Sequence, residues 1–177
     1  MNKLKEFIVD FHYQLEENGY ETCFLSQSEL KNKIQVNGYE TCFPMISYEK
    51  SCDNSIISDI NESLFLNDSD YDNDWIGIYK DGELFSFICL QNGEDEDIDI
   101  GAFEINTEYR GQGYAKKIIN IFENCAYHND YVRVCLTPFD SNASSFWEYM
   151  DYDDEGFYFI KELGVMNRSK ERNPKCL

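Results

Sequence analysis

The sequence predicts a mixed α/β domain, in which helices and strands are interspersed along the chain. Apolar residues recur at helical spacing over residues 3–17, which predicts an amphipathic helix. Two apolar runs, 75–79 and 84–90, flank an Asp81-Gly82 pair that is typical of a tight hairpin turn. The chain has 177 residues, of which 42% are hydrophobic and 16% aromatic, and this is enough for one globular domain with a sizeable core.

A heptapeptide, Asn-Gly-Tyr-Glu-Thr-Cys-Phe, occurs at residues 18–24 and returns unchanged at residues 37–43. Each copy follows a predicted helix and opens a β-prone stretch. Because two copies are too few to build a solenoid, we interpret the repeat as a local duplication that forms two similar helix-to-strand corners. A redox or metal clip between Cys23 and Cys42 is the alternative.

The remaining elements follow in order. Residues 51–66 carry apolar side chains on one helical face, and an acidic loop, 67–74, connects this predicted helix to the hairpin. Further strands are predicted over residues 98–105, 131–136 and 157–161.

The strand over residues 98–105 contains an irregularity. Ile98, Ile100 and Ala102 are apolar on even numbers, whereas Phe103 and Ile105 are apolar on odd numbers. A β-bulge near Ala102 explains this change, because one extra residue turns the following side chains to the other face. The bulge also leaves backbone groups unpaired, and such groups can bind a ligand.

The segment after this strand, Tyr-Arg-Gly-Gln-Gly-Tyr-Ala at residues 109–115, runs into a predicted helix. Its small residues let a ligand approach the backbone, and the first N–H groups of the helix carry the positive end of the helix dipole. Arg110 adds a cationic side chain. The segment therefore predicts a phosphate or pyrophosphate site, although its spacing fits neither a P-loop nor a dinucleotide-binding motif.

Residues 110–115 resemble the Arg/Gln-x-x-Gly-x-Gly/Ala signature of the GNAT (general-control-related N-acetyltransferase) superfamily and match every fixed position. The order of the surrounding elements, over about residues 39–163, is also similar to that family. The resemblance implies a mixed, mostly antiparallel sheet that is splayed at its bulged central strand, with helices on both faces. Residues 1–36 would then be an N-terminal helical extension with part of the duplicated heptapeptide, and residues 37–177 the GNAT-like acetyltransferase domain.

The resemblance further implies that acetyl-CoA is the acyl donor and that its acetyl group passes directly to an amine. The backbone of Phe103, Glu104 and Ile105 would grip the pantetheine arm and the thioester. The signature segment would hold the pyrophosphate through Arg110, Gly111, Gln112, Gly113, Tyr114, Ala115 and Lys116. The family's next helix would contribute Asn142 and Trp147, which stand near or at its usual asparagine and tyrosine.

The candidate catalytic residues depart from the family's usual pattern. Trp147 stands where the family commonly has a tyrosine that protonates the leaving thiolate, and an indole N–H is no practical acid. Tyr149 is the candidate acid, although a shift of two residues rotates a helical side chain by about 200°. Asp99 and Glu104, on either side of the bulge, are the candidate bases, and a solvated surface carboxylate is the alternative for each.

Composition narrows the partners. The chain has 15 basic and 34 acidic residues and a net charge of −19, so we expect neither direct nucleic-acid binding nor membrane binding. A cationic amine substrate or a basic protein is the expected partner. A catalytically idle GNAT-like domain that binds a basic protein or mimics nucleic acid is the alternative function, and a homodimer is compatible with either.

Targeting and metal signals are not evident in the sequence. There is no apolar run of the roughly 18 residues that a membrane span needs and no signal-peptide pattern, so a cytoplasmic location is expected. The seven cysteines and two histidines have no metal-site or catalytic-triad spacing, so no metal is expected and reduced, mostly buried thiols are predicted.

Overall fold

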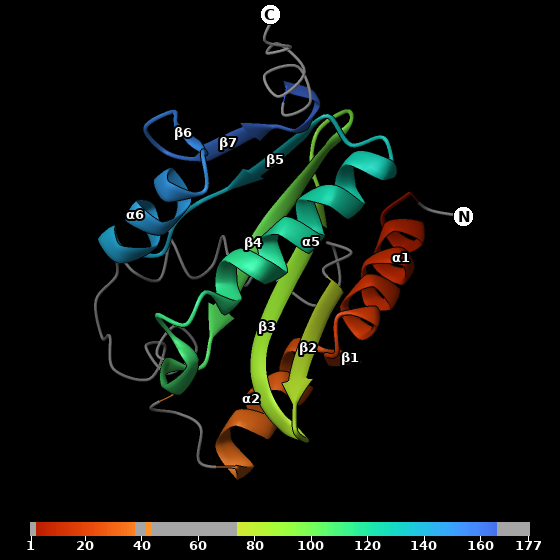
Figure 1. Ribbon diagram of the computed structural model, residues 1–177, viewed down its shortest axis with the longest axis vertical. Coiled ribbons are helices and arrows are strands. Elements are labelled where there is room, and N and C mark those ends of the chain that lie inside the picture. Colours follow the sequence, from red (N-terminus) through yellow and green to blue (C-terminus); the bar gives the residue numbers. More distant parts are fainter. Residues whose placement is uncertain (1–2, 38–41, 44–73, 166–177) are drawn as a thin grey trace, which may run out of the picture.

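The computed structural model describes residues 3–37, 42–43 and 74–165. Its centre is a seven-stranded sheet in the order β1-β2-β3-β4-β5-β7-β6 (Figure 1). The strands are β1 (Glu21–Leu25), β2 (Asp74–Lys80), β3 (Glu83–Asn92), β4 (Asp97–Ile105), β5 (Arg133–Leu136), β6 (Asp153–Asp154) and β7 (Phe159–Glu162). All neighbours are antiparallel except β4 and β5, which are parallel. The predicted mixed, mostly antiparallel sheet is confirmed.

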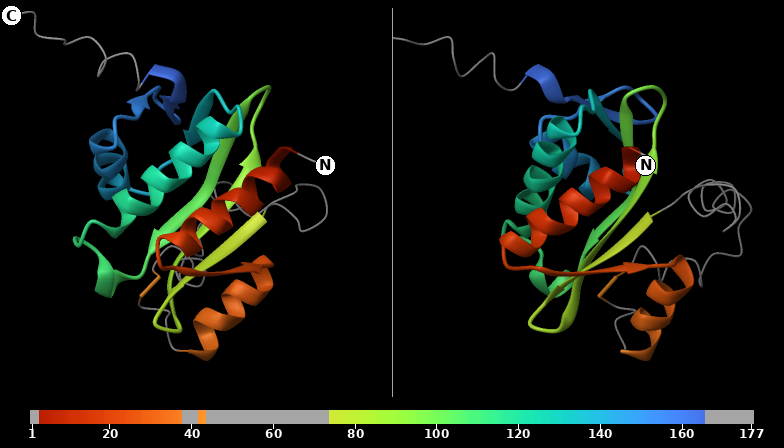
Figure 2. Two further views of the ribbon diagram at one scale, coloured as in Figure 1. Left: turned by 45° about the vertical axis from the view of Figure 1, so that its right-hand side comes forward. Right: turned by 90° about the vertical axis from the view of Figure 1, so that its right-hand side faces the viewer.

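Helices cover both faces of this sheet, as predicted (Figure 2). The helices are α1 (Lys3–Glu17), α2 (Gln27–Val36), α5 (Tyr114–His128) and α6 (Ser141–Tyr149), with 3-10 turns η3 (Thr107–Tyr109) and η4 (Leu163–Val165). Helices α1 and α5 pack into the larger apolar cluster on one face, and α2 packs into a smaller cluster on the other. None of these helices is long and apolar enough to span a bilayer.

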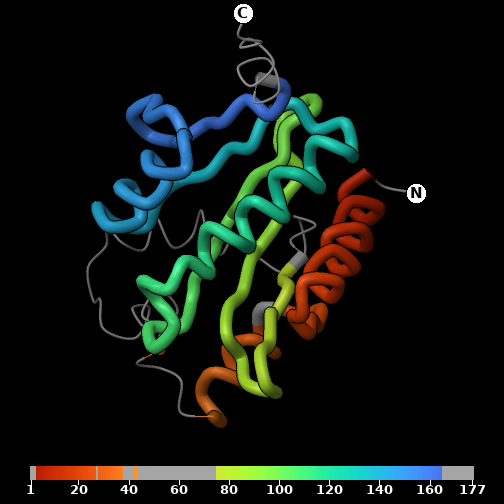
Figure 3. Tube along the Cα trace, in the orientation of Figure 1, coloured from red at the N-terminus to blue at the C-terminus, as the bar shows by residue number. Residues whose placement is uncertain are grey.

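The N-terminal segment is built into the fold. Helix α1 lies beside α5 (Figure 3), and the rings of Phe7 and Phe11 contact Phe122 of α5 at 5.4 and 5.6 Å between centroids. Strand β1 pairs with β2 along its whole length. The segment predicted as an extension thus shares the sheet and the core with later elements, while the boundary of the family domain at residue 37 stays a prediction.

The first heptapeptide copy forms the predicted helix-to-strand corner between α1 and β1. Most of the second copy, the helix predicted at 51–66 and the loop up to residue 73 lie outside the described residues. Phe24 of the first copy is 51% exposed, whereas Phe43 of the second is fully buried, so identical sequences occupy different environments. The described cysteines are all free thiols, and among them Cys89 and Cys125 are buried while Cys23 is exposed.

The hairpin and the bulge occur where the sequence predicts them. Asp81 and Gly82 have φ angles of 54° and 81°, as the turn between β2 and β3 requires. In the β3–β4 register, Ala102 lies opposite Cys89 and Ile100 opposite Leu90, so Gly101 is the extra residue. The side chains before and after this residue therefore face the same core although their numbers change parity.

Strands β4 and β5 separate at the bulge. Strand β5 pairs with β4 only from Asp97 to Ile100, whereas β3 accompanies β4 to Ile105. Residues 101–105 of β4 consequently present one backbone edge to an opening in the sheet. This opening positions the candidate site.

Candidate active site

The open edge of β4 consists of the backbone of Phe103 and Ile105. Asn106 N–H donates to Phe85 O at 3.0 Å, so residue 106 faces β3. Because successive residues of a strand point their N–H and C=O groups to opposite sides, Phe103 and Ile105 face the opening. These are two of the three residues for which the sequence predicts a backbone grip on a cofactor.

A loop and a helix N-terminus border this edge. Gly111 and Gly113 have φ angles of 73° and 81°, a left-handed conformation that glycine adopts without strain. Gly113 is the N-cap of α5 and provides no capping side chain. The first turn of α5 therefore has no side-chain cap on its N–H groups, and the anion site expected at this segment stays a prediction.

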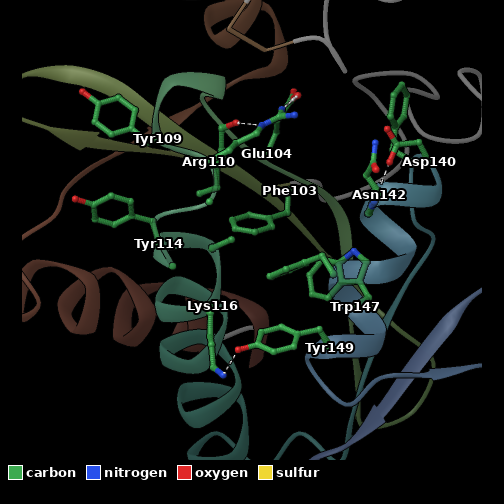
Figure 4. Close-up of a pocket in the computed structure, with 17 residues that line it drawn as sticks. Phe103, Glu104, Tyr109, Arg110, Tyr114, Lys116, Asp140, Asn142, Trp147 and Tyr149 are labelled. Carbon is green, nitrogen blue, oxygen red and sulfur yellow. Dashed lines mark hydrogen bonds and ion pairs between the residues drawn. The ribbon is translucent and has the colours of Figure 1, made fainter.

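A pocket of about 470 Å³ lies between these elements and α6 (Figure 4). It is lined by Phe103, Glu104, Ile105, Tyr109, Arg110, Gly111, Gly113, Tyr114, Ala115, Lys116, Phe139, Asp140, Asn142, Ala143, Phe146, Trp147 and Tyr149. Every residue predicted for the site is among them except Gln112, which donates to Glu108 O at 3.1 Å on the surface, and Asp99. The pocket thus brings together segments that the sequence separates by some 45 positions.

Arg110 has partners within the protein. Its Nη2 lies 2.8 Å from Glu104 Oε1, and its Nε donates to Ile105 O at 2.9 Å. Glu104 is 7% exposed, so this ion pair ties the loop to the end of β4. Sequence reasoning assigned Arg110 to a phosphate and missed the contact with Glu104, because only the turn through η3 brings the two residues together.

Helix α6 forms the opposite wall of the pocket. Its N-cap Asp140 accepts a hydrogen bond from Ala143 N–H at 2.8 Å. The Trp147 ring is 5% exposed and packs between Phe103 and Tyr152, at centroid distances of 6.2 and 4.9 Å. The family's tyrosine position is therefore a packing position in this chain.

Tyr149 points from α6 toward α5 (Figure 4). Lys116 Nζ donates to the Tyr149 hydroxyl at 2.8 Å and lies 4.5 Å from the centre of its ring. Tyr149 is 63% exposed. The two-residue shift separates it from the contacts of Trp147, as expected from helix geometry, but leaves it at the pocket.

Asp99 lies on the same sheet face as Glu104, on the pre-bulge part of β4. Burial, with Asp97 and Glu94 as further causes, raises the pKa of Asp99 to about 6. Asp97 itself is held by Arg133, with its oxygens 2.9 and 2.7 Å from the guanidinium. Asp99 is therefore a carboxyl group that titrates close to neutral pH, outside the pocket lining.

Three aromatic lining residues, Tyr109, Phe139 and Phe146, are not among the predicted site residues, whereas Tyr114 is. Tyr109 and Tyr114 each contact Phe85 edge-on at 5.0 Å, and Lys80 donates a hydrogen bond to the Tyr114 hydroxyl. Phe139 and Phe146 line the α6 side. These aromatic residues stand next to the predicted loop and helix in the sequence. Such proximity does not distinguish an aromatic side chain that lines the pocket from one that packs in the core.

Comparison with known proteins identifies the family. The model of the family described as "Acetyltransferase (GNAT) family" matches residues 37–152. The chain belongs to the GNAT acetyltransferase family. Curated proteins provide no match to this GNAT chain.

Solved structures show the same fold. An acetyltransferase of the GNAT family from Staphylococcus aureus is 11% identical with a TM-score of 0.53, covering 82% of this chain and 99% of that one. A putative N-acetyltransferase from Lactobacillus plantarum is 15% identical with a TM-score of 0.54, and the match covers 81% of this chain and 98% of that one. The PaiA N-acetyltransferase of Thermoplasma acidophilum, in complex with coenzyme A, is 16% identical with a TM-score of 0.52, covering 81% and 99%.

Proposed function

We propose that this GNAT protein uses acetyl-CoA to acetylate an amine, by direct transfer, on a cationic small molecule or a basic protein segment. The observation that carries the proposal is the pocket, which joins the open edge of β4 to the glycine-led N-terminus of α5. An extended amide-containing arm fits the first feature and a pyrophosphate the second. The coenzyme A complex of the Thermoplasma structure supports this choice of ligand.

The residues present fit such a cofactor. Phe103 and Ile105 offer strand-like backbone groups to the pantetheine arm, and the first turn of α5 with Lys116 offers positive charge to the phosphates. Arg110 keeps its bond to Glu104 and holds the loop in place. Acetyl-CoA supplies the acetyl group as a reactive thioester.

Two side chains are proposed to move protons. Asp99 accepts the proton that the amine must lose, through water, because a pKa near 6 leaves it ionised yet basic at neutral pH. Tyr149 donates a proton toward the thiolate side of the pocket, with Lys116 bound to its hydroxyl. Glu104, which the sequence offers as a second base, is engaged by Arg110 and is proposed to position the loop rather than to act as the base.

The acidic surface supports a cationic acceptor. The hairpin after α6 carries exposed Asp153, Asp154 and Glu155, and the whole chain has a net charge of −19. Such a field attracts a polyamine, an aminoglycoside-like molecule or a lysine-rich segment. A structure of aminoglycoside 6'-N-acetyltransferase with coenzyme A, 10% identical with a TM-score of 0.52, shares the fold.

Calorimetric titration with coenzyme A tests the donor site. We expect binding to the wild type and its loss in Gly113→Trp, whose side chain would fill the space beside the loop, with unchanged circular dichroism. A flat wild-type titration with folded protein would refute the proposal.

A panel of amines, polyamines and basic peptides, assayed for thiol release from acetyl-CoA, then tests transfer. The buried Trp147 at the family's tyrosine position favours the idle binding domain as the second candidate. Coenzyme A binding without thiol release for any acceptor, together with capture of a basic protein, would support that alternative.

A further inference from the structure

A buried ion pair lies where α5, β7 and the end of α6 meet, outside the pocket lining. The side chains of Lys161 and Glu123 are 5% and 6% exposed. Lys161 Nζ donates to both carboxylate oxygens of Glu123 at 2.9 Å and to the carbonyl oxygen of Met150 at 2.6 Å. Met150 is the C-cap of α6, so one ammonium group joins three elements.

This ion pair is one attachment between α5 and α6, and the contact of Lys116 with Tyr149 is another. Lys116 and Glu123 are seven residues apart, so they share one face of α5 and lie about 10 Å apart along its axis. At Lys116 the helix contacts exposed Tyr149 at the pocket, and at Glu123 it contacts Lys161, which holds the end of α6. The contact at Tyr149 is exposed, whereas the contact at Glu123 is buried.

The attachment reaches the pocket through α6. Lys161 Nζ lies 5.1 Å from the centre of the Tyr152 ring, and that ring packs on Trp147 at 4.9 Å. Tyr152 N–H also donates to Trp147 O at 3.1 Å. Trp147 in turn packs against Phe103 of the open β4 edge.

The chemistry of the Glu123–Lys161 ion pair favours a role in positioning α6 rather than in stabilising the fold. Burial raises the pKa of Glu123, and its hydrogen bonds and charge interaction with Lys161 oppose that rise. A buried ion pair commonly adds no stability over apolar residues of similar volume, since desolvation of both charges offsets their attraction. Its directional hydrogen bonds, and a positive charge at the C-terminal end of α6, instead fix where that helix ends.

We propose that Glu123 and Lys161 are positioning residues that set the separation of α5 and α6, the two walls of the pocket, and thereby its affinity for coenzyme A. The choice of coenzyme A as the ligand rests on the proposed function. The effect of the ion pair on the position of α6, and hence of Trp147, does not. The two statements can therefore fail separately.

The test compares Glu123→Leu/Lys161→Met with Lys3→Met. Lys3 is a matched control, because its Nζ also donates to a carbonyl after a helix, Asp130 O at 2.9 Å, and lies 4.1 Å from a tyrosine ring centre. In a Trp75→Phe background, acrylamide quenching reports Trp147 alone without any ligand. Calorimetry gives the Kd for coenzyme A, and thermal unfolding gives stability.

We expect the double variant to unfold cooperatively near the wild-type midpoint, with Trp147 quenched more readily and coenzyme A bound at least about tenfold more weakly. Lys3→Met should match the wild type in quenching and Kd. Unchanged quenching and Kd in the double variant would overturn the proposal. If the double variant does not fold, Glu123→Gln, which keeps the side-chain volume, decides by the same two readouts. Failure of wild-type protein to bind coenzyme A would refute the proposed function and leave the quenching result to judge the positioning.

Discussion

At the residue scale, Asp99 combines a raised pKa with the role of proton acceptor in the proposed reaction. Its pKa of about 6 lies above the ordinary aspartate value, so the folded state binds the proton more tightly than the unfolded chain. The stabilisation that this proton brings is complete below about pH 4 and is lost as the pH rises through 6. At neutral pH the charged Asp99 therefore destabilises the fold.

Asp99→Asn should accordingly raise the free energy of unfolding at pH 7.5 by about 1 kcal/mol, after allowance for partial solvent exposure, and change it little at pH 4. If Asp99 is the base, the same variant lowers kcat/KM by about 100-fold and removes a rising limb near pH 6. Denaturant unfolding at both pH values and pH–rate profiles measure these effects. A variant that gains stability at full activity would show that Asp99 is not the base.

The variant Tyr149→Phe removes the hydroxyl and keeps the ring, so it distinguishes their two roles. We expect kcat to fall by about 100-fold, since the proposed proton donor is lost, with a small change in KM for acetyl-CoA because the ring remains at the pocket. Lys116→Met is the comparison variant: it keeps the Tyr149 hydroxyl but removes its partner and a charge near the proposed phosphate site, so it should raise KM for acetyl-CoA more than it lowers kcat. Equal kcat values for Tyr149→Phe and the wild type would assign thiolate protonation to water.

At the element scale, the loop into α5 depends on backbone conformation more than on space. Gly113 has a φ of +81°, and a Cβ added there would meet no atom within 4 Å. Gly113→Ala should therefore cost about 1–2 kcal/mol of unfolding free energy through left-handed strain alone, while Gly113→Asn should cost less because Asn tolerates that conformation. Gly164→Ala, where neither constraint applies, is the control. Equal costs for Ala and Asn would contradict this account.

The same elements show how far local sequence patterns reach. The hairpin at Asp81-Gly82, the bulge at Gly101 and the glycine-led helix could be predicted because each depends on neighbouring residues. The ion pairs of Arg133 with Asp97 and of Lys161 with Glu123 could not, because tertiary packing brings together partners that are 36 and 38 positions apart. Glu123 and Lys161 did leave a signal, since each charged residue stands in phase with apolar positions of its helix or strand, where a solvated side chain is not expected.

At the scale of the whole molecule, charge acts in opposite directions on the two proposed substrates. The net charge of −19 would attract the proposed cationic acceptor and repel the proposed anionic donor, and we expect Lys116 and the N-terminus of α5 to offset that repulsion locally. Salt weakens both long-range effects, because the screening length falls to about 10 Å at 0.1 M.

Raising NaCl from 20 to about 150 mM should therefore increase KM for a polyamine acceptor several-fold. The KM for acetyl-CoA should stay constant or fall, because salt also screens the repulsion between the donor and the acidic protein, and this compensates for weakened phosphate contacts. Acetyl-pantetheine, which lacks the phosphates, is the control donor and should show no dependence on salt. Thiol-release kinetics at each salt concentration measure all three constants. A polyamine KM that is independent of salt would show that the acidity of this protein serves something other than acceptor capture, because an attraction of this range cannot survive screening unchanged.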